Sequence, residues 1–139
     1  MAYTTIDDPE AYFQNVIWTG NGSSGRAITF AGETDMQPNI VWSKSRGTNG
    51  YGFPHLWDSA RGTQKLLRPD NDDPPSNKTG SDGLTAFSSD GFTIGGDDGV
   101  NKNTINFVAW CWKESATSGV DLVTYTGNAT DDTDISHNL

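Results

Sequence analysis

The segment 105–112 is the sequence feature that most limits the folds open to this chain. Alternate side chains of an extended strand point to opposite faces. Both faces of this segment would be apolar, with Val108, Trp110 and Trp112 on one and Phe107, Ala109 and Cys111 on the other. Such a strand is typical of the centre of a sheet with a covering layer on each side. We therefore expect 105–112 to be a central, buried strand.

The composition favours strands in the rest of the chain as well. Helix formers are scarce, with three Glu, five Lys and six Leu among 139 residues, whereas Thr and Gly each number 16. Thr is favoured in strands and Gly in tight turns. A chain of this length supports one core. We predict an all-β fold, an antiparallel β-sandwich of the jelly-roll kind.

Turn residues separate the expected strands. Strands are predicted at 13–18, 27–30, 39–45, the second half of 51–58, 64–67, 84–87 and 92–94. The pair Asp90-Gly91 predicts a hairpin between the last two. The segment 69–80 holds three prolines and almost no apolar side chain, which predicts a solvated loop. Among the large apolar residues, we expect Trp42, Phe92, Trp110 and Trp112 to form the core.

An internal repeat divides the chain. Residues 16–21, Val-Ile-Trp-Thr-Gly-Asn, align without gaps on 123–128, Val-Thr-Tyr-Thr-Gly-Asn, and the alignment extends from Ile28-Thr29 to Ile135-Ser136. A module therefore begins near Phe13, and a second copy opens near Val120. We predict an N-terminal arm at 1–12, a sandwich at 13–119, and the first strand of a second, incomplete repeat at 120–139.

Charge and cysteine content exclude several classes of partner and fold. The net charge is −9, and no basic stripe could neutralise phosphates, so we expect neither nucleic acid nor membrane as a partner. One cysteine permits no internal disulfide, which suits synthesis in a reducing cytoplasm. Neither a signal peptide nor a membrane-spanning run is present in this sequence.

Several motifs together resemble a family of structural proteins of tailed phages, especially marine ones. The motifs are Trp-Ser-Lys-Ser-Arg at 42–46, His-Leu-Trp-Asp-Ser-Ala-Arg-Gly at 55–62, Ser-Asp-Gly-Phe-Thr-Ile-Gly at 89–95 and Phe-Val-Ala-Trp-Cys-Trp-Lys at 107–113. The resemblance implies repeated sandwich modules similar to the concanavalin A-like and laminin-G-like jelly rolls. It also implies a place in a tail fibre or other virion appendage, and no catalytic residues.

The resemblance extends to residues 1–14, which implies an N-terminal module that docks to the particle. We expect Tyr3, Ile6 and Tyr12 to serve this docking arm, because the arm has too few apolar residues for a core of its own. The expected partners are other virion proteins, either tail adaptor or nozzle subunits or the capsid. A homo-oligomer is expected, and the analogy with phage fibres favours a trimer. The virion, assembled in the host cytoplasm, is the expected location.

Catalytic patterns in the sequence are weak. His55, Asp58 and Ser59 could suggest a hydrolase, but they lie in one strand-turn segment without a nucleophile elbow. The strand 105–112 carries no acid that could serve a glycosidase. We therefore predict a protein that is not an enzyme. Arg61 is expected to form an ion pair with Asp58.

The sequence contains few candidate ligands for a metal ion and one candidate aromatic platform. His137 has no ligand-spaced partner for zinc. We expect no cofactor; calcium is the alternative, through Asp70, Asp72, Asp73, Asp97 and Asp98, although their spacing does not match a helix-loop-helix site. Tyr51, Phe53 and Trp57 could form a contact platform for a glycan or a protein. The alternative is a purely structural role, in which Trp57 lies in the core.

These observations favour a phage virion structural protein, the particle-attachment module of a tail fibre or similar appendage used in host adsorption. Missing distal modules would then contact a host surface glycan. The alternatives are a carbohydrate-binding, lectin-like module and a capsid decoration or head-fibre protein.

Overall fold

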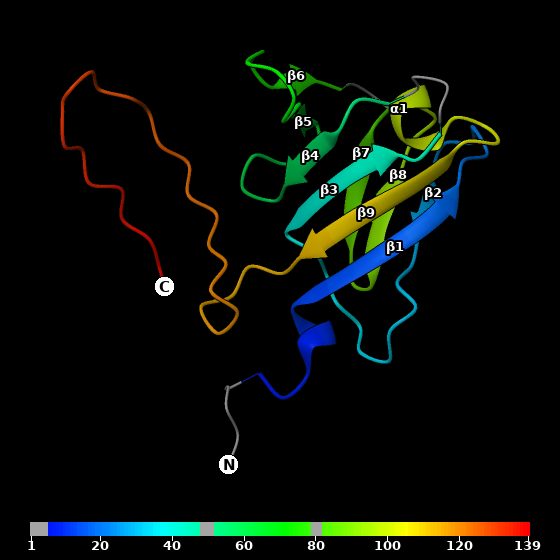
Figure 1. Cartoon of the computed structure of the whole chain (residues 1–139), viewed down its shortest axis with the longest axis horizontal. Helices are drawn as coiled ribbons and strands as arrows, with labels where there is room; N and C mark the ends of the chain where they lie inside the picture. Colours follow the sequence, from blue (N-terminus) through cyan, green and yellow to red (C-terminus); the bar gives the residue numbers. More distant parts are fainter. Residues whose placement is uncertain (1–5, 48–51, 79–81) are drawn as a thin grey trace.

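The computed structural model describes residues 6–47, 52–78 and 82–139, and its strands form an antiparallel β-sandwich (Figure 1). The elements in chain order are η1 (Pro9–Ala11), β1 (Phe13–Thr19), β2 (Arg26–Ile28), β3 (Ile40–Ser45), β4 (His55–Asp58), β5 (Lys65–Leu66), β6 (Ser76–Asn77), β7 (Leu84–Ser88), β8 (Gly91–Ile94), α1 (Asp98–Asn101) and β9 (Asn106–Trp112). The predicted all-β fold is confirmed. The short strand β6 lies inside the segment expected to be only loop.

Two sheets make the layers of the sandwich. The larger sheet has the order β1-β9-β3-β4 and the smaller the order β2-β8-β7, while β5 and β6 form a separate ribbon. All pairings are antiparallel. In Figure 1, β1, β9 and β3 lie in front of β7 and β8. The segment 105–112 therefore contains a central strand, β9, as its apolar pattern predicts.

The predicted hairpin is formed by β7 and β8. Ser88 pairs with Gly91, so Ser89 and Asp90 make the turn. Gly91 has a φ of 99°, and a Cβ at this position would lie 2.1 Å from the carbonyl oxygen of Ile28. Both observations require glycine here, because other residues rarely adopt this φ and none could approach the β2 backbone so closely.

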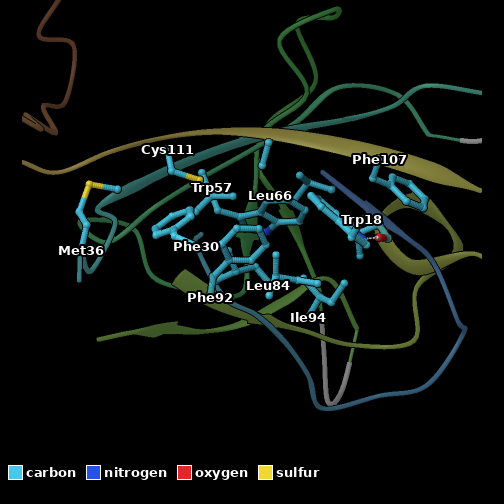
Figure 2. Close-up of a cluster of buried hydrophobic side chains, with 14 residues drawn as sticks. Trp18, Phe30, Met36, Trp57, Leu66, Leu84, Phe92, Ile94, Phe107 and Cys111 are labelled. Carbon is cyan, nitrogen blue, oxygen red and sulfur yellow. Dashed lines mark hydrogen bonds between the residues drawn. The ribbon is translucent and has the colours of Figure 1, made fainter. Parts of the chain in front are cut away.

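The core lies between the two sheets and is rich in aromatic rings (Figure 2). Trp18 of β1 stacks on Phe107 of β9, with ring centroids 5.4 Å apart, and meets Phe92 of β8 edge-on at 5.8 Å. The indole Nε1 of Trp18 donates a hydrogen bond of 3.0 Å to the carbonyl oxygen of Val100, which satisfies its buried N–H. The predicted core position of Phe92 is confirmed.

The expected core positions of Trp42, Trp110 and Trp112 are wrong. Trp42 is 40% exposed, and the other two are half-buried on the same side of the sheet. The strand period explains this placement, because Phe107, Ala109 and Cys111 take the inward positions of β9. One face of β9 is covered by the second sheet. The other, although equally apolar, carries no covering layer in Figure 1.

The N-terminal segment from Asp8 onward folds onto the sandwich. Asp8 caps η1 and accepts a hydrogen bond from the Thr34 hydroxyl, while a Glu10 carboxylate oxygen accepts one from the Glu33 N–H. The backbone oxygen of Tyr12 accepts a hydrogen bond from Lys113 N–H, which continues the β1–β9 ladder. The boundary of the predicted arm is therefore wrong at its C-terminal end, since 8–12 belong to the sandwich. Ile6 and Tyr12 are half-buried, and Tyr3 lies outside the described residues.

The C-terminal segment 121–139 contains no strand, although all its residues are described. An isolated bridge between Ser115 and Val120 precedes it. Residues 122–125 line a hollow with Asp58 of β4 and Arg61, and the rest of the segment extends away from the strands in Figure 1. The strand predicted in the second repeat is thus not formed in this structure. The described residues include no helix with the length and apolar character needed to cross a membrane.

Candidate functional site

The candidate site is the outer face of the larger sheet, the face turned away from the core. It is formed by the outward side chains of three strands: Phe13, Asn15 and Ile17 of β1, Val108, Trp110 and Trp112 of β9, and Ile40, Trp42 and Lys44 of β3. The register places these residues in cross-strand rows. Trp110 lies between Asn15 and Trp42, and Trp112 lies between Phe13 and Ile40.

A hollow on this face, here called the aromatic groove, is lined by Trp42, Lys44, Pro54, Trp110 and Trp112 and has a volume of about 480 Å³. The ring centroids of Trp42 and Trp110 are 6.0 Å apart, with an interplanar angle of 58°. Phe13 supports Trp112 at 5.2 Å from the β1 side. Trp42 and Trp110 therefore hold each other in place and Phe13 holds Trp112, while each of the three tryptophans stays partly exposed.

Two cationic side chains, Lys44 and Arg46, lie on the same face. Lys44 lines the aromatic groove, and Arg46, the next outward position of the chain, lines a second hollow with Ile17, Thr19 and Asn106. Neither side chain has a hydrogen-bond or ion-pair partner in the described part of the chain. The face is therefore aromatic and positive, although the whole chain has a net charge of −9.

The four strands of this sheet contain one carboxylate, Asp58, and it is neutralised. Arg61 donates to Asp58 from its backbone N–H at 2.8 Å and from Nε at 2.6 Å, in addition to the Nη2 contact. This confirms the ion pair predicted from the sequence. The pair is largely buried, so it stabilises the β4 turn and leaves the positive charge of the outer face uncompensated.

The contact platform predicted from Tyr51, Phe53 and Trp57 is not assembled. Trp57 is only 1% exposed and belongs to the core, so its predicted contact role is wrong. Phe53 is 54% exposed, but the Arg68 guanidinium lies 3.5 Å from its ring centre. Tyr51 lies outside the described residues. The sequence does not reveal the aromatic groove, because an apolar pattern on both faces of β9 predicts burial on both.

The residues of the suspected hydrolase motif point in different directions. His55 is buried and packs edge-on against Trp57 at 5.2 Å, whereas Asp58 is engaged by Arg61. Burial lowers the pKa of His55 to about 4, because the interior disfavours the charged imidazolium. Ser59 accepts a hydrogen bond from Asn39. No nucleophile-base contact exists among these three side chains.

Four of the five acidic residues considered for calcium, Asp70, Asp73, Asp97 and Asp98, have other partners. Asp97 caps α1 through Gly99 N–H and pairs with Lys78 at 2.6 Å, while Asp70 pairs with Arg68 at 3.0 Å. Burial alone would raise the pKa of Asp97, but the hydrogen bonds from Lys78 and Gly99 outweigh it and lower that pKa. Within residues 6–47, 52–78 and 82–139, no three His, Cys, Asp or Glu side chains gather as a metal site.

A family model described as "Domain of unknown function (DUF7483)" matches residues 8–139. The chain belongs to this family. No curated protein and no solved structure matches it. The DUF7483 match begins at the cap of η1 and takes in both the sandwich and the second copy of the repeat, so 8–12 and 120–139 are parts of the family's pattern.

Within the DUF7483 match, the second copy keeps one local feature of the first. The side chain of Asn21 accepts a hydrogen bond from Ser23 N–H at 2.9 Å, and that of Asn128 accepts one from Thr130 N–H at 3.0 Å. The two turns stand at equivalent repeat positions. The second copy, however, leaves Val123, Tyr125 and Ile135 exposed.

Proposed function

We propose that this DUF7483 domain is a non-enzymatic structural module of a phage virion. In this role it attaches a tail fibre or similar appendage to the particle and contributes to host adsorption. The virion is its location, other virion subunits are its partners, and copies of the chain associate, in the manner of trimeric fibres.

The observation that carries the proposal is the second copy of the first strand and turn. Tyr125 and Ile135 occupy the repeat positions of Trp18 and Ile28, which are core residues in the first copy. Their exposure indicates a segment whose burial needs further sandwich structure. Sandwich modules that follow one another along a chain suit an extended appendage, as repeat proteins grow by adding units that contact their neighbours.

The test is to locate the domain on purified particles. Antibodies raised against the folded chain should label an appendage in electron micrographs, and the label should remain after the particles are washed at high salt. Label on the capsid surface would instead favour the decoration alternative. Absence of the protein from particles, judged by immunoblot, would contradict a virion role of either kind.

A deletion then tests the attachment role. Removing residues 2–7 leaves the Asp8 cap and all later elements in place, so the sandwich should fold. We expect the shortened protein to be missing from particles. The matched control removes 71–73 from the exposed loop between β5 and β6 and should be incorporated normally. Normal incorporation of the chain lacking 2–7 would place the attachment surface elsewhere.

A further inference from the structure

We propose that the outer face of the larger sheet binds an acidic oligosaccharide. Sugar rings pack on Trp42, Trp110 and Trp112, and carboxylate or sulfate groups pair with Lys44 and Arg46. This site is distinct from the Tyr51, Phe53 and Trp57 platform. The inference rests on the geometry of the face and is independent of the proposed virion role.

The aromatic groove has the shape and chemistry of a small-ligand site. Its volume of about 480 Å³ falls within the range of roughly 300–1,000 Å³ that is usual for such sites. An aromatic ring has a negative face, which attracts the weakly positive C–H groups on the flat side of a sugar ring. Trp42 and Trp110 form a cross-strand pair, so their open ring surfaces lie next to each other and can accept adjacent sugar units.

The charges on the face select an acidic sugar over a neutral one. Trp42 and Lys44 are outward positions of β3, and Arg46, the residue that follows β3, is the next outward position. Neighbouring positions in this series are about 7 Å apart along the strand. The line runs from the aromatic groove to the second hollow, where Asn106 is also exposed. An acidic group one or two sugar units beyond a stacked ring would therefore meet an unpaired cation.

A segment of another copy of the chain fits this face less well. The C-terminal segment is acidic and has exposed apolar residues, but the repeat relates Tyr125 and Ile135 to Trp18 and Ile28. Those two side chains lie between the sheets of the sandwich. The exposed residues of the C-terminal segment thus match an inner core and not an outer face. In addition, the centres of protein interfaces are depleted of charge, whereas Lys44 lines the groove itself.

Calorimetric titration of the full chain tests the proposal with three probes. The probes are a hexamer of galacturonic acid, a heparin hexasaccharide and neutral cellohexaose, each at low and at physiological salt. We expect one or both acidic probes to bind, with affinity that falls as salt screens the charges. The carboxylated and sulfated probes distinguish which acidic group the cations prefer. Cellohexaose should bind at least about tenfold more weakly than the better acidic probe.

Variants locate the site. Lys44→Glu and Arg46→Glu change exposed side chains that have no partner among the described residues, so folding is not at risk, and each should weaken acidic binding about tenfold or more. Trp42→Ala should abolish detectable binding. The matched control is Phe53→Ala, which removes an exposed aromatic ring outside the groove and should leave affinity unchanged.

Several results would overturn the inference. These are failure of both acidic probes to bind, equal binding of cellohexaose, or acidic binding that survives both Lys44→Glu and Arg46→Glu. Light scattering could give one more contradicting result. If Trp42→Ala converts an oligomer to a monomer, the face is covered by another protein chain in solution and is not open to a sugar. If Trp42→Ala fails to fold, the two charge variants decide the outcome.

Discussion

The first strand of the sandwich and its copy near the C-terminus share a pattern but not an environment. Trp18 is 7% exposed and Ile28 is 4% exposed, whereas their repeat equivalents Tyr125 and Ile135 are 70% and 39% exposed. The first copy pairs with β9 along seven residues and is closed over by the second sheet. The second has neither, so an apolar strand pattern alone does not form a strand.

The turn that follows each copy, unlike the strand, keeps the same local hydrogen bond in both copies. Asn21 and Asn128 each accept a hydrogen bond from the backbone N–H two residues later, because that contact needs only the neighbouring backbone. In the first copy the turn is held further by buried Asn101, whose side-chain oxygen accepts from Asn21 N–H and whose Nδ2 donates to Ser23 O. Local contacts therefore survive without the sandwich, while burial and long-range hydrogen bonds depend on it.

The largest expected difference in stability is between substitutions of Trp18 and of its repeat equivalent, Tyr125. Trp18→Ala should lower the free energy of unfolding by about 3–5 kcal/mol, because it leaves a cavity in the core and removes the partner of Val100 O. Tyr125→Ala should change it by less than about 0.5 kcal/mol, as expected for an exposed site. Urea unfolding of the two variants measures both. Similar losses would mean that Tyr125 is buried in solution, and the comparison would break.

The two histidines give the second contrast, in pH dependence. His55 has a folded pKa of about 4, against about 6.5 when unfolded, so the unfolded state binds more protons between these values. The contribution of neutral His55 to the free energy of unfolding is fully present above about pH 6.5 and is lost as the pH drops toward 4, by about 3 kcal/mol. Asp97, whose pKa is lowered, adds its own loss only at lower pH.

Chemical unfolding from pH 7 to pH 4 checks this slope. His55→Gln should flatten it, since the buried ionisable group is gone. His137→Gln, in the exposed second copy, should leave it unchanged. A steep slope that persists in His55→Gln would assign the acid sensitivity to carboxylates.

The smallest expected contrast concerns the glycine of each turn. A Cβ on Gly20 would lie 2.0 Å from the carbonyl oxygen of Lys102, whereas a Cβ on Gly127 would have nothing within 4 Å. Gly20→Ala should therefore cost about 1–3 kcal/mol through forced backbone movement. Gly127→Ala should be close to neutral, and thermal unfolding of both variants tests the difference. An undisturbed Gly20→Ala variant would indicate that the α1–β9 connection can shift freely.

The outer face illustrates how far the sequence could predict a site. The sequence shows that Trp42 and Lys44, like Trp110 and Trp112, are two residues apart, which places each pair on one side of a strand. Which side faces the core is not readable when both are apolar, as in β9. Trp57 takes an inward position of β4, opposite the buried Val41 of β3, so its ring lies in the core between the sheets.

Sequence alone determined the all-β class, the central place of 105–112, the β7–β8 hairpin and the Asp58–Arg61 pair. These depend on strand period, turn residues and contacts within a few positions. Tertiary structure alone decided that Trp18 is core while Tyr125 is exposed, that 8–12 join the sandwich, and that three tryptophans stay partly exposed beside Lys44 and Arg46. The physical reason is that burial is a property of the layers around a residue. Those layers come from segments far away in the chain, such as β8, which covers Trp18 but not Trp110.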